Sequence, residues 1–156
     1  MHKVHVPLNA SRADVYEALL PQVSAVVSGE SDAIANFANV SAMLKEAFNF
    51  FWVGFYRLVE SGDLVLGPFQ GTLACSRIGM GKGVCGTAAF RQTTIIVSDV
   101  EQFEGHIACS SLSRSEIVVP VFKEGALCAV LDIDSTELND FSEIDAIYLE
   151  KIVALL

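Results

Sequence analysis

The chain of 156 residues is acidic and apolar: ten basic and nineteen acidic side chains give a formal net charge of −9, and 52% of the residues are hydrophobic. This apolar fraction excludes an intrinsically disordered chain, and the negative charge argues against phosphate backbones and anionic membranes as partners. No apolar run reaches the roughly 18 residues that span a bilayer, and residues 1–7 lack the apolar stretch of a secretory signal. We therefore expect one domain over residues 1–156 in the cytoplasm, with no nucleic-acid or membrane partner.

The first third of the chain predicts two helices. Apolar residues recur at helical spacing in the first segment, with Pro21 expected to kink or split it: Val15, Leu19, Val23, Val26 and Val27. Ser31 or Asp32 can cap a second helix, whose apolar stripe runs from Ile34 to Phe48.

The pattern changes to strands and loops after residue 49. Residues 50–59 are aromatic and β-branched, which predicts a strand with Trp52 and Tyr56 on one face. A turn at 61–63 leads to a second strand that begins at Leu64. Seven of the eleven glycines lie between residues 62 and 86, so we expect loops there in which the backbone approaches other groups closely. A short helix over 86–91 and a strand over 94–97 follow.

The last third predicts an irregular stretch, a hairpin and a helix. Residues 98–114 are polar and irregular, as functional loops often are. Two strands follow at 116–123 and 126–134, and Ser142 with Asp145 forms a capping box at the start of a terminal helix. Helices at both ends with strands between them predict an α+β fold with an antiparallel sheet.

The four cysteines require an explanation in a reducing compartment. The cysteines are Cys75, Cys85, Cys109 and Cys128. No two of them are as close in sequence as the cysteine pairs that bind structural zinc. Cys128 lies in an apolar strand and is expected to be core. The other three lie in loops or at element ends, where thiols can be exposed, although packing explains each of them slightly better when it is taken singly. Cys109 has His106 and Arg114 nearby in sequence, which can favour the thiolate.

Two acidic residues, Asp132 and Asp134, end an otherwise apolar strand and share one face. A two-residue turn at 124–125 would place Glu116 on the opposite face of the sheet from Asp132. A three-residue loop at 123–125 with Gly125 in the left-handed conformation instead pairs Glu116 with Asp132. We predict the three-residue loop, which gathers three carboxylates that repel one another, so that at least one has a raised pKa and can hold a proton near neutrality.

Seven stretches in chain order resemble the free methionine-R-sulfoxide reductases, which are single GAF domains. They are WVGFY at 52–56, LGPFQG at 66–71, ACSRI at 74–78, GKGVCGTA at 81–88, GHIAC at 105–109, SRSEIVVP at 113–120 and VLDIDS at 130–135. The resemblance covers nearly the whole chain. It implies a GAF-like central antiparallel sheet flanked by N- and C-terminal helices, and a pocket for a small molecule.

The resemblance also implies a role for each site residue. Cys109 would be the nucleophile, Cys75 the main resolving cysteine and Cys85 a second one, whereas Cys128 matches no functional position. The acidic positions that line the family's pocket are matched by Glu116, Asp132 and Asp134. Trp52 and Tyr56 match its aromatic wall, although periodicity alone favours simple core packing for these two.

By the same resemblance, the expected reaction is reduction of free methionine R-sulfoxide to methionine, a defence against oxidative stress. Cys109 would become a sulfenic acid, a disulfide would form within the chain, and thioredoxin would reduce it, with no organic cofactor or metal. The apolar end at residues 152–156 favours a homodimer, and so does the frequent dimerisation of GAF relatives. Two alternatives are a non-catalytic GAF ligand-binding module and a thiol-redox sensor that forms the Cys75–Cys109 disulfide without a substrate.

Overall fold

The computed structural model describes residues 3–156 and has one six-stranded antiparallel sheet with helices on both faces. In chain order the elements are α1 (Arg12–Val27), α2 (Ala33–Phe48), β1 (Trp52–Leu58), β2 (Leu64–Gln70), β3 (Arg77–Ile78), α3 (Gly83–Arg91), β4 (Ile95–Val97), the short 3-10 helix η1 (Val100–Gln102), β5 (Ser115–Lys123), β6 (Ala126–Ser135) and α4 (Glu143–Val153). The expected α+β class with an antiparallel sheet is confirmed.

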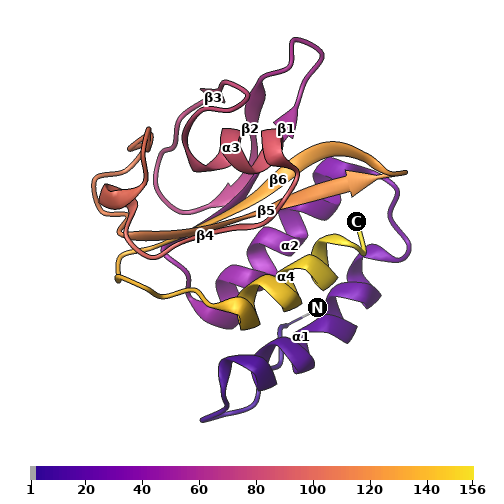
Figure 1. Ribbon diagram of the computed structural model, residues 1–156. Coiled ribbons are helices and arrows are strands. Elements are labelled where there is room, and N and C mark those ends of the chain that lie inside the picture. The colour runs from indigo at the N-terminus through magenta and orange to yellow at the C-terminus, as the bar shows by residue number, and fades with distance from the viewer. Residues whose placement is uncertain (1–2) are drawn as a thin grey trace.

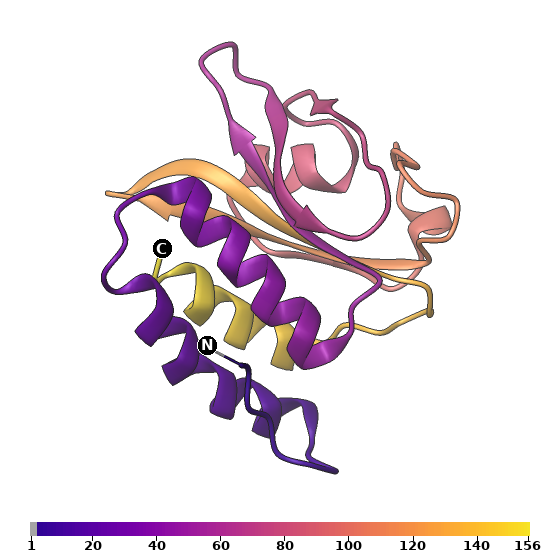
Figure 2. The same ribbon diagram turned by 180° about the vertical axis from the view of Figure 1, so that it is seen from behind.

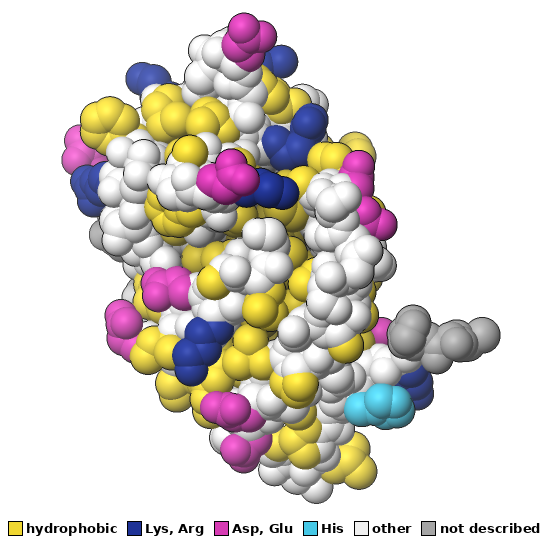
Figure 3. Space-filling view, turned by 90° about the vertical axis from the view of Figure 1, so that its right-hand side faces the viewer, with side chains coloured by type: hydrophobic (Ala, Val, Ile, Leu, Met, Phe, Trp, Pro, Cys, Tyr) yellow, Lys and Arg dark blue, Asp and Glu magenta, His cyan; other side chains and the backbone are white. Residues whose placement is uncertain are grey.

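The sheet has the strand order β3-β2-β1-β6-β5-β4 and separates two layers. Helices α2 and α4 pack on one face, and α1 lies outside them, so that helices two deep cover this side (Figures 1 and 2). Helix α3 and the long loops cover the other face. In residues 3–156 no helix is both long and apolar enough to cross a bilayer. Apolar side chains lie among scattered charged ones at the surface (Figure 3), in keeping with a mean hydropathy of +0.46.

Helix α1 runs through Pro21 as one element, so the expected split does not occur. Ser11 caps its first turn by accepting a hydrogen bond from the backbone N–H of Asp14. Tyr16 and Leu19 before the proline and Val23 after it are fully buried. Because both halves pack into the same core, tertiary contacts hold the helix together where the proline removes a backbone hydrogen bond.

Alternation along the central strands divides the apolar side chains into two clusters, one on each face of the sheet. Val53, Phe55 and Ile133 belong to the cluster under the helices. Trp52 and Tyr56 belong to the cluster on the other face, as their period-two spacing predicts. This second face of β1, β5 and β6 carries the polar side chains described below.

The β5–β6 hairpin differs from the expected three-residue loop. Glu124 and Gly125 have φ of 52° and 80°, and Lys123 pairs with Ala126, which makes a two-residue turn with both residues left-handed. A β-bulge then shifts the register: Phe122 pairs with Leu127, but Val121 pairs with Ala129. The predicted loop is therefore wrong. The two-residue turn alone would place Glu116 on the opposite face of the sheet from Asp132. The extra residue of the bulge shifts the pairing by one, so Glu116 pairs with Asp134 and stays on the face of Asp132.

Candidate active site

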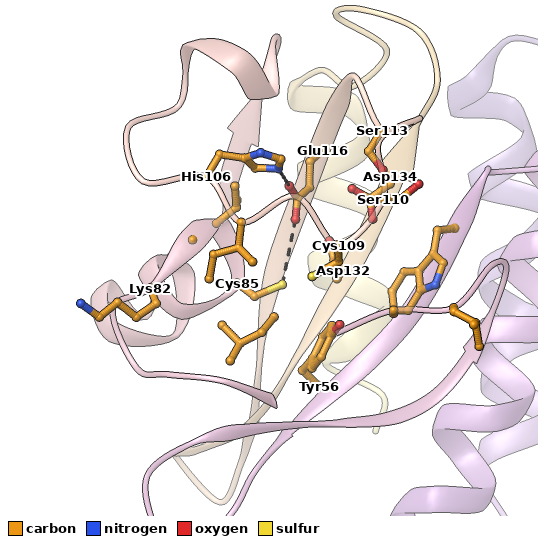
Figure 4. Close-up of a pocket in the computed structure, with 17 residues that line it drawn as sticks. Tyr56, Lys82, Cys85, His106, Cys109, Ser110, Ser113, Glu116, Asp132 and Asp134 are labelled. Atoms are coloured by element: carbon orange, nitrogen blue, oxygen red, sulfur yellow. Dashed lines mark hydrogen bonds and ion pairs between the residues drawn. The ribbon is translucent and has the colours of Figure 1, made fainter. Parts of the chain in front are cut away.

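A pocket lies on the sheet face opposite α2 and α4, between β1, β5, β6, α3 and the loop that precedes β5 (Figure 4). Seven of the eight residues singled out from the sequence line it: Trp52, Tyr56, Cys85, Cys109, Glu116, Asp132 and Asp134. The eighth, Cys75, is bonded to Cys109. The cavity itself is small, at about 40 Å³.

The strand register places the polar side chains of the pocket in two adjacent rows across the sheet. In the first row Trp52 of β1 pairs with Asp134 of β6, which pairs in turn with Glu116 of β5. In the second row Asp132 lies opposite Gly54 and Val118. Because side chains two residues apart on a strand share a face, all three carboxyl groups point into one space.

The carboxyl groups are buried together, so each disfavours the charge of the others. Glu116 and Asp132 are 5% and 6% exposed. Burial, followed by the charge of Asp134, raises the pKa of Glu116 to about 8. Burial raises the pKa of Asp132 and of Asp134 well above the ordinary range, with Glu116 and Asp132 as the respective charged neighbours. The three carboxyl groups therefore share one buried space, and Glu116, with a pKa of about 8, holds a proton at neutral pH.

Cys85 belongs to this cluster and is buried, in agreement with the packing that the sequence slightly favoured for it when taken singly. It lies in the first turn of α3, is 3% exposed, and its Sγ is 4.0 Å from Oε1 of Glu116. Burial, with the charges of Asp132 and Glu116, raises the pKa of the thiol. A glycine permits this placement, since a Cβ on Gly86 would come within 2.3 Å of the Gly79 carbonyl oxygen.

One ligand atom each from Cys85, Glu116 and Asp132 lies within 4.8 Å of the others, which makes this a group that can hold a metal ion. A thiol and two carboxyl groups suit a borderline-soft divalent cation such as zinc. The argument from the sequence against zinc rested on the spacing of cysteines and histidines and did not weigh carboxylates. These three side chains come from three different elements.

The disulfide joins two loops at the pocket. Cys75 and Cys109 are covalently bonded, with their Cα atoms 5.3 Å apart. Cys109 lines the pocket, whereas Cys75 is not among the lining residues of the described chain. The Tyr56 hydroxyl donates a hydrogen bond of 2.9 Å to the carbonyl oxygen of Cys75, which holds this loop to the sheet. Cys128 packs against the helix-side core, half-buried, and its thiol donates to the carbonyl of Val121.

The aromatic wall serves as core and as pocket lining at once. Trp52 is 3% exposed and its indole N–H donates a 3.0 Å hydrogen bond to the carbonyl of Thr72. Its ring stacks on Phe69 with centroids 5.2 Å apart. A Cβ on Gly71 would lie 2.5 Å from the indole, and Gly71 has a φ of +144°, so glycine is required for the loop to pass this ring.

His106 contributes to the site in a way that sequence reasoning missed. Its Nε2 lies 3.7 Å from Oε2 of Glu116, and burial lowers the pKa of the imidazole. From its proximity in sequence, His106 was instead expected to be a partner of Cys109. Arg114, suggested on the same ground, is exposed and is not among the lining residues of the described chain. Ser113, beside Asp134 in Figure 4, also lines the pocket and gave no signal in the sequence.

Comparison with known proteins shows the family to which the chain is related. The model of the GAF domain family matches residues 38–156. GAF domain-containing protein A of Dictyostelium discoideum is 58% identical, with 94% of this chain and 92% of that protein covered. The free methionine-R-sulfoxide reductase of Escherichia coli is 44% identical over 94% of this chain and 88% of its own length. A crystal structure of free methionine-R-sulfoxide reductase from Neisseria meningitidis in complex with its substrate superposes with a TM-score of 0.96, at 51% identity, covering 99% of this chain and 93% of that one.

Proposed function

The chain belongs to the GAF domain family, and within it to the free methionine-R-sulfoxide reductases, and from this membership we propose that it reduces free methionine R-sulfoxide to methionine. One observation carries the proposal: Cys109 lies in the wall of a pocket with three buried carboxyl groups and is already paired with a second cysteine, Cys75. This arrangement supplies a nucleophile, a proton donor and a resolving thiol in one place.

The pocket suits an amino acid that carries a polar sulfoxide and an apolar methyl group. A carboxylate among Glu116, Asp132 and Asp134 can hold the ammonium group of the substrate. Trp52 and Tyr56 would enclose the methyl and thioether, since sulfur–aromatic contacts contribute about 0.3–1.5 kcal/mol each. A methionine within a protein has its nitrogen in a peptide bond and carries no ammonium group for these carboxyl groups to bind, which favours the free amino acid as substrate.

The raised pKa values give the carboxyl groups their chemical role. The sulfur of a sulfoxide accepts electrons poorly unless its oxygen is protonated, and Glu116, with a pKa of about 8, holds a proton at neutral pH. Burial raises the pKa of Asp132 and of Asp134 as well. The group that donates to the oxygen and the group that binds the ammonium are therefore drawn from the same three residues.

The proposed reaction balances with these residues and an external dithiol. The thiolate of Cys109 attacks the sulfoxide sulfur, the oxygen passes to Cys109 as a sulfenic acid, and methionine leaves reduced by two electrons. The thiol of Cys75 then attacks the Cys109 sulfur, which releases water and forms the disulfide. Thioredoxin supplies two electrons and two protons to restore both thiols. Cys85 would act as a second resolving thiol, and the proposed reaction uses no metal or organic cofactor.

We further propose a cytoplasmic homodimer. Three apolar side chains on and after α4 remain 40–49% exposed at helical spacing: Ile144, Ile147 and Leu155. A second copy of the chain could cover them. Light scattering at micromolar concentration tests this, and a monomeric mass would contradict it.

A single assay separates the reductase from its alternatives. The protein is given free methionine R- or S-sulfoxide with thioredoxin, thioredoxin reductase and NADPH. We expect methionine from the R form alone, with turnover abolished in Cys109→Ser and retained in the matched control Cys128→Ser. A thiol-redox sensor would be oxidised by peroxide but produce no methionine, and a ligand-binding module would bind without turnover. Persistent activity in Cys109→Ser would refute the proposed nucleophile.

A further inference from the structure

We propose that Leu73, Ile107 and Leu112 form a docking rim for the protein dithiol that reduces the Cys75–Cys109 disulfide, and that this partner attacks the sulfur of Cys75. The inference rests on the proposed function, because it concerns how the oxidised protein is recycled. The partner is a small protein with two neighbouring cysteines, of which the reactive one lies in an apolar surface.

The rim consists of large apolar side chains that are at least partly exposed to water and lie within three residues of a bonded cysteine in the sequence. Leu73 is 90% exposed, Leu112 58% and Ile107 38%. Leu73 comes two residues before Cys75 and Ile107 two residues before Cys109.

The chain itself keeps the rim close to the disulfide. Two residues of chain span at most about 7 Å, so Leu73 and Ile107 each have their Cα within that distance of a bonded cysteine. Even a small redox interface, with about 500 Å² on each partner, covers a disc about 13 Å in radius. A protein that reaches the disulfide must therefore contact this rim.

Single exposed leucines are common and need no explanation. Here one apolar residue flanks each half of a bond that another protein has to reach. Redox partners bind briefly through small interfaces, and a few apolar contacts around the reacting sulfur supply most of the affinity in such encounters.

The pocket favours one of the two sulfurs as the leaving group. Among the described residues, Cys109 lines the cavity together with the buried carboxyl groups, whereas Cys75 does not line it. Of the two bonded sulfurs, that of Cys109 is therefore the one placed beside acids that can protonate a departing thiolate, which favours attack on Cys75. Cys109 is then the leaving group and returns into the pocket, where Glu116, with a pKa of about 8, can give it a proton.

Each step of the exchange conserves atoms and electrons. The partner thiolate forms a bond to the Cys75 sulfur, the Cys75–Cys109 bond breaks, and Cys109 leaves with the electron pair. The second thiolate of the partner then attacks the partner's own first sulfur, which releases Cys75 as a thiolate. The protein gains two electrons and, with protonation, two thiols, and the partner ends as a disulfide.

The rim is tested by the ratio of thioredoxin-supported to dithiothreitol-supported turnover, because dithiothreitol is too small to need a docking surface. Leu112→Glu, outside the pocket lining, should raise the KM for thioredoxin about tenfold and leave turnover with dithiothreitol unchanged. Leu112→Ser should act in the same direction without adding charge, and Leu73→Glu should lower the ratio. The matched control is Leu8→Glu: Leu8 is 92% exposed and precedes α1, the helix that lies on the opposite side of the sheet from α3 (Figure 1).

An unchanged ratio in both Leu112 variants and in Leu73→Glu would overturn the rim while leaving the reductase itself intact. If the unmodified protein turned over with neither reductant, the proposed function would fail instead.

The attacked sulfur is identified by trapping. A thioredoxin whose second active-site cysteine is replaced by serine cannot complete the exchange and remains attached to the oxidised protein. Peptide mass spectrometry should find the mixed disulfide on Cys75. Attachment mainly to Cys109 would overturn the assigned direction of attack.

Discussion

Glu116 and Asp134 stand directly opposite each other on β5 and β6, with both carboxyl groups on the pocket face. Two ionised carboxylates at opposed positions of a sheet repel, and burial adds to the cost of their charges. The pair therefore keeps at least one proton at neutral pH, and this proton is available to a sulfoxide oxygen.

The rate of sulfoxide reduction should follow the protonation of this pair. Because the protonated acid is the active form, kcat/KM should fall as the pH rises above about 8, the pKa of Glu116. Glu116→Gln should lower kcat about a hundredfold. The measurement is a pH profile of methionine formation with excess dithiothreitol, corrected for the alkaline ionisation of the reductant. A profile that stays flat up to pH 10 would contradict the role of the buried acids.

The same raised pKa makes the stability of the fold depend on pH. Between the unfolded pKa of a glutamic acid, near 4.5, and the folded value of about 8, the folded state binds more protons at Glu116 than the unfolded state does. Unfolding free energy should therefore decrease as the pH rises through this window, with a slope of at most about 1.4 kcal/mol per pH unit for each such proton. Glu116→Gln should reduce the slope. Denaturant unfolding at pH 5.5, 7 and 8.5 measures it, and a slope unchanged by the substitution would exclude Glu116 as its source.

The two candidate resolving cysteines should differ in turnover. Cys75 is bonded to Cys109, whereas Cys85 is buried and its pKa is raised, so little of it is thiolate. Cys75→Ser should release a single equivalent of methionine quickly and then turn over at least tenfold more slowly with thioredoxin. Cys85→Ser should continue past the first turnover. Rapid-quench measurement of methionine shows both phases, and the double variant Cys75→Ser/Cys85→Ser reveals whether Cys85 supports the slow rate.

Binding of methionine should depend on the redox state of the protein. With the disulfide formed, the cavity of about 40 Å³ has room for a few water molecules, since roughly 10–15 Å³ suffices for one. Methionine is far larger, so we expect the oxidised protein to bind it at least tenfold more weakly than the reduced protein. Calorimetry with and without dithiothreitol tests this. Equal affinity in the two states would mean that the disulfide does not restrict the pocket.

Local patterns in the sequence predicted most of the elements of the fold. Caps and apolar stripes located α2 and α4, and alternation located β1, β5 and β6. β3 has only two residues, too few for any periodicity, and is held by its pairing with β2. The start of α3 at Gly83 was placed three residues late, because its first turn has no side-chain cap and depends on packing of glycines against the loop.

The composition of the site was predicted better than its geometry. Glu116, Asp132 and Asp134 were expected on one face and lie there, but the reason given, a three-residue loop, was wrong. Burial of Cys85 and the contact of His106 with Glu116 depend on how α3 and the loop before β5 fold over the sheet. Long-range packing of this kind leaves no pattern in a single sequence.

The bulge in the β5–β6 hairpin gives Cys128 a significance unrelated to thiol chemistry. It is the residue of β6 that has no Cα partner on β5, between Leu127 and Ala129. Removing it would straighten the hairpin onto its two-residue turn and leave Asp132 opposite Val118 as before. Removing Leu131 would instead move each later side chain of β6 to the other face of the sheet. Asp132 and Asp134 would then face the apolar core under the helices, and Ile133 would face the pocket. A one-residue deletion is therefore compatible with the pocket at the bulge, whereas the same deletion a few residues later would remove the carboxyl groups from the pocket.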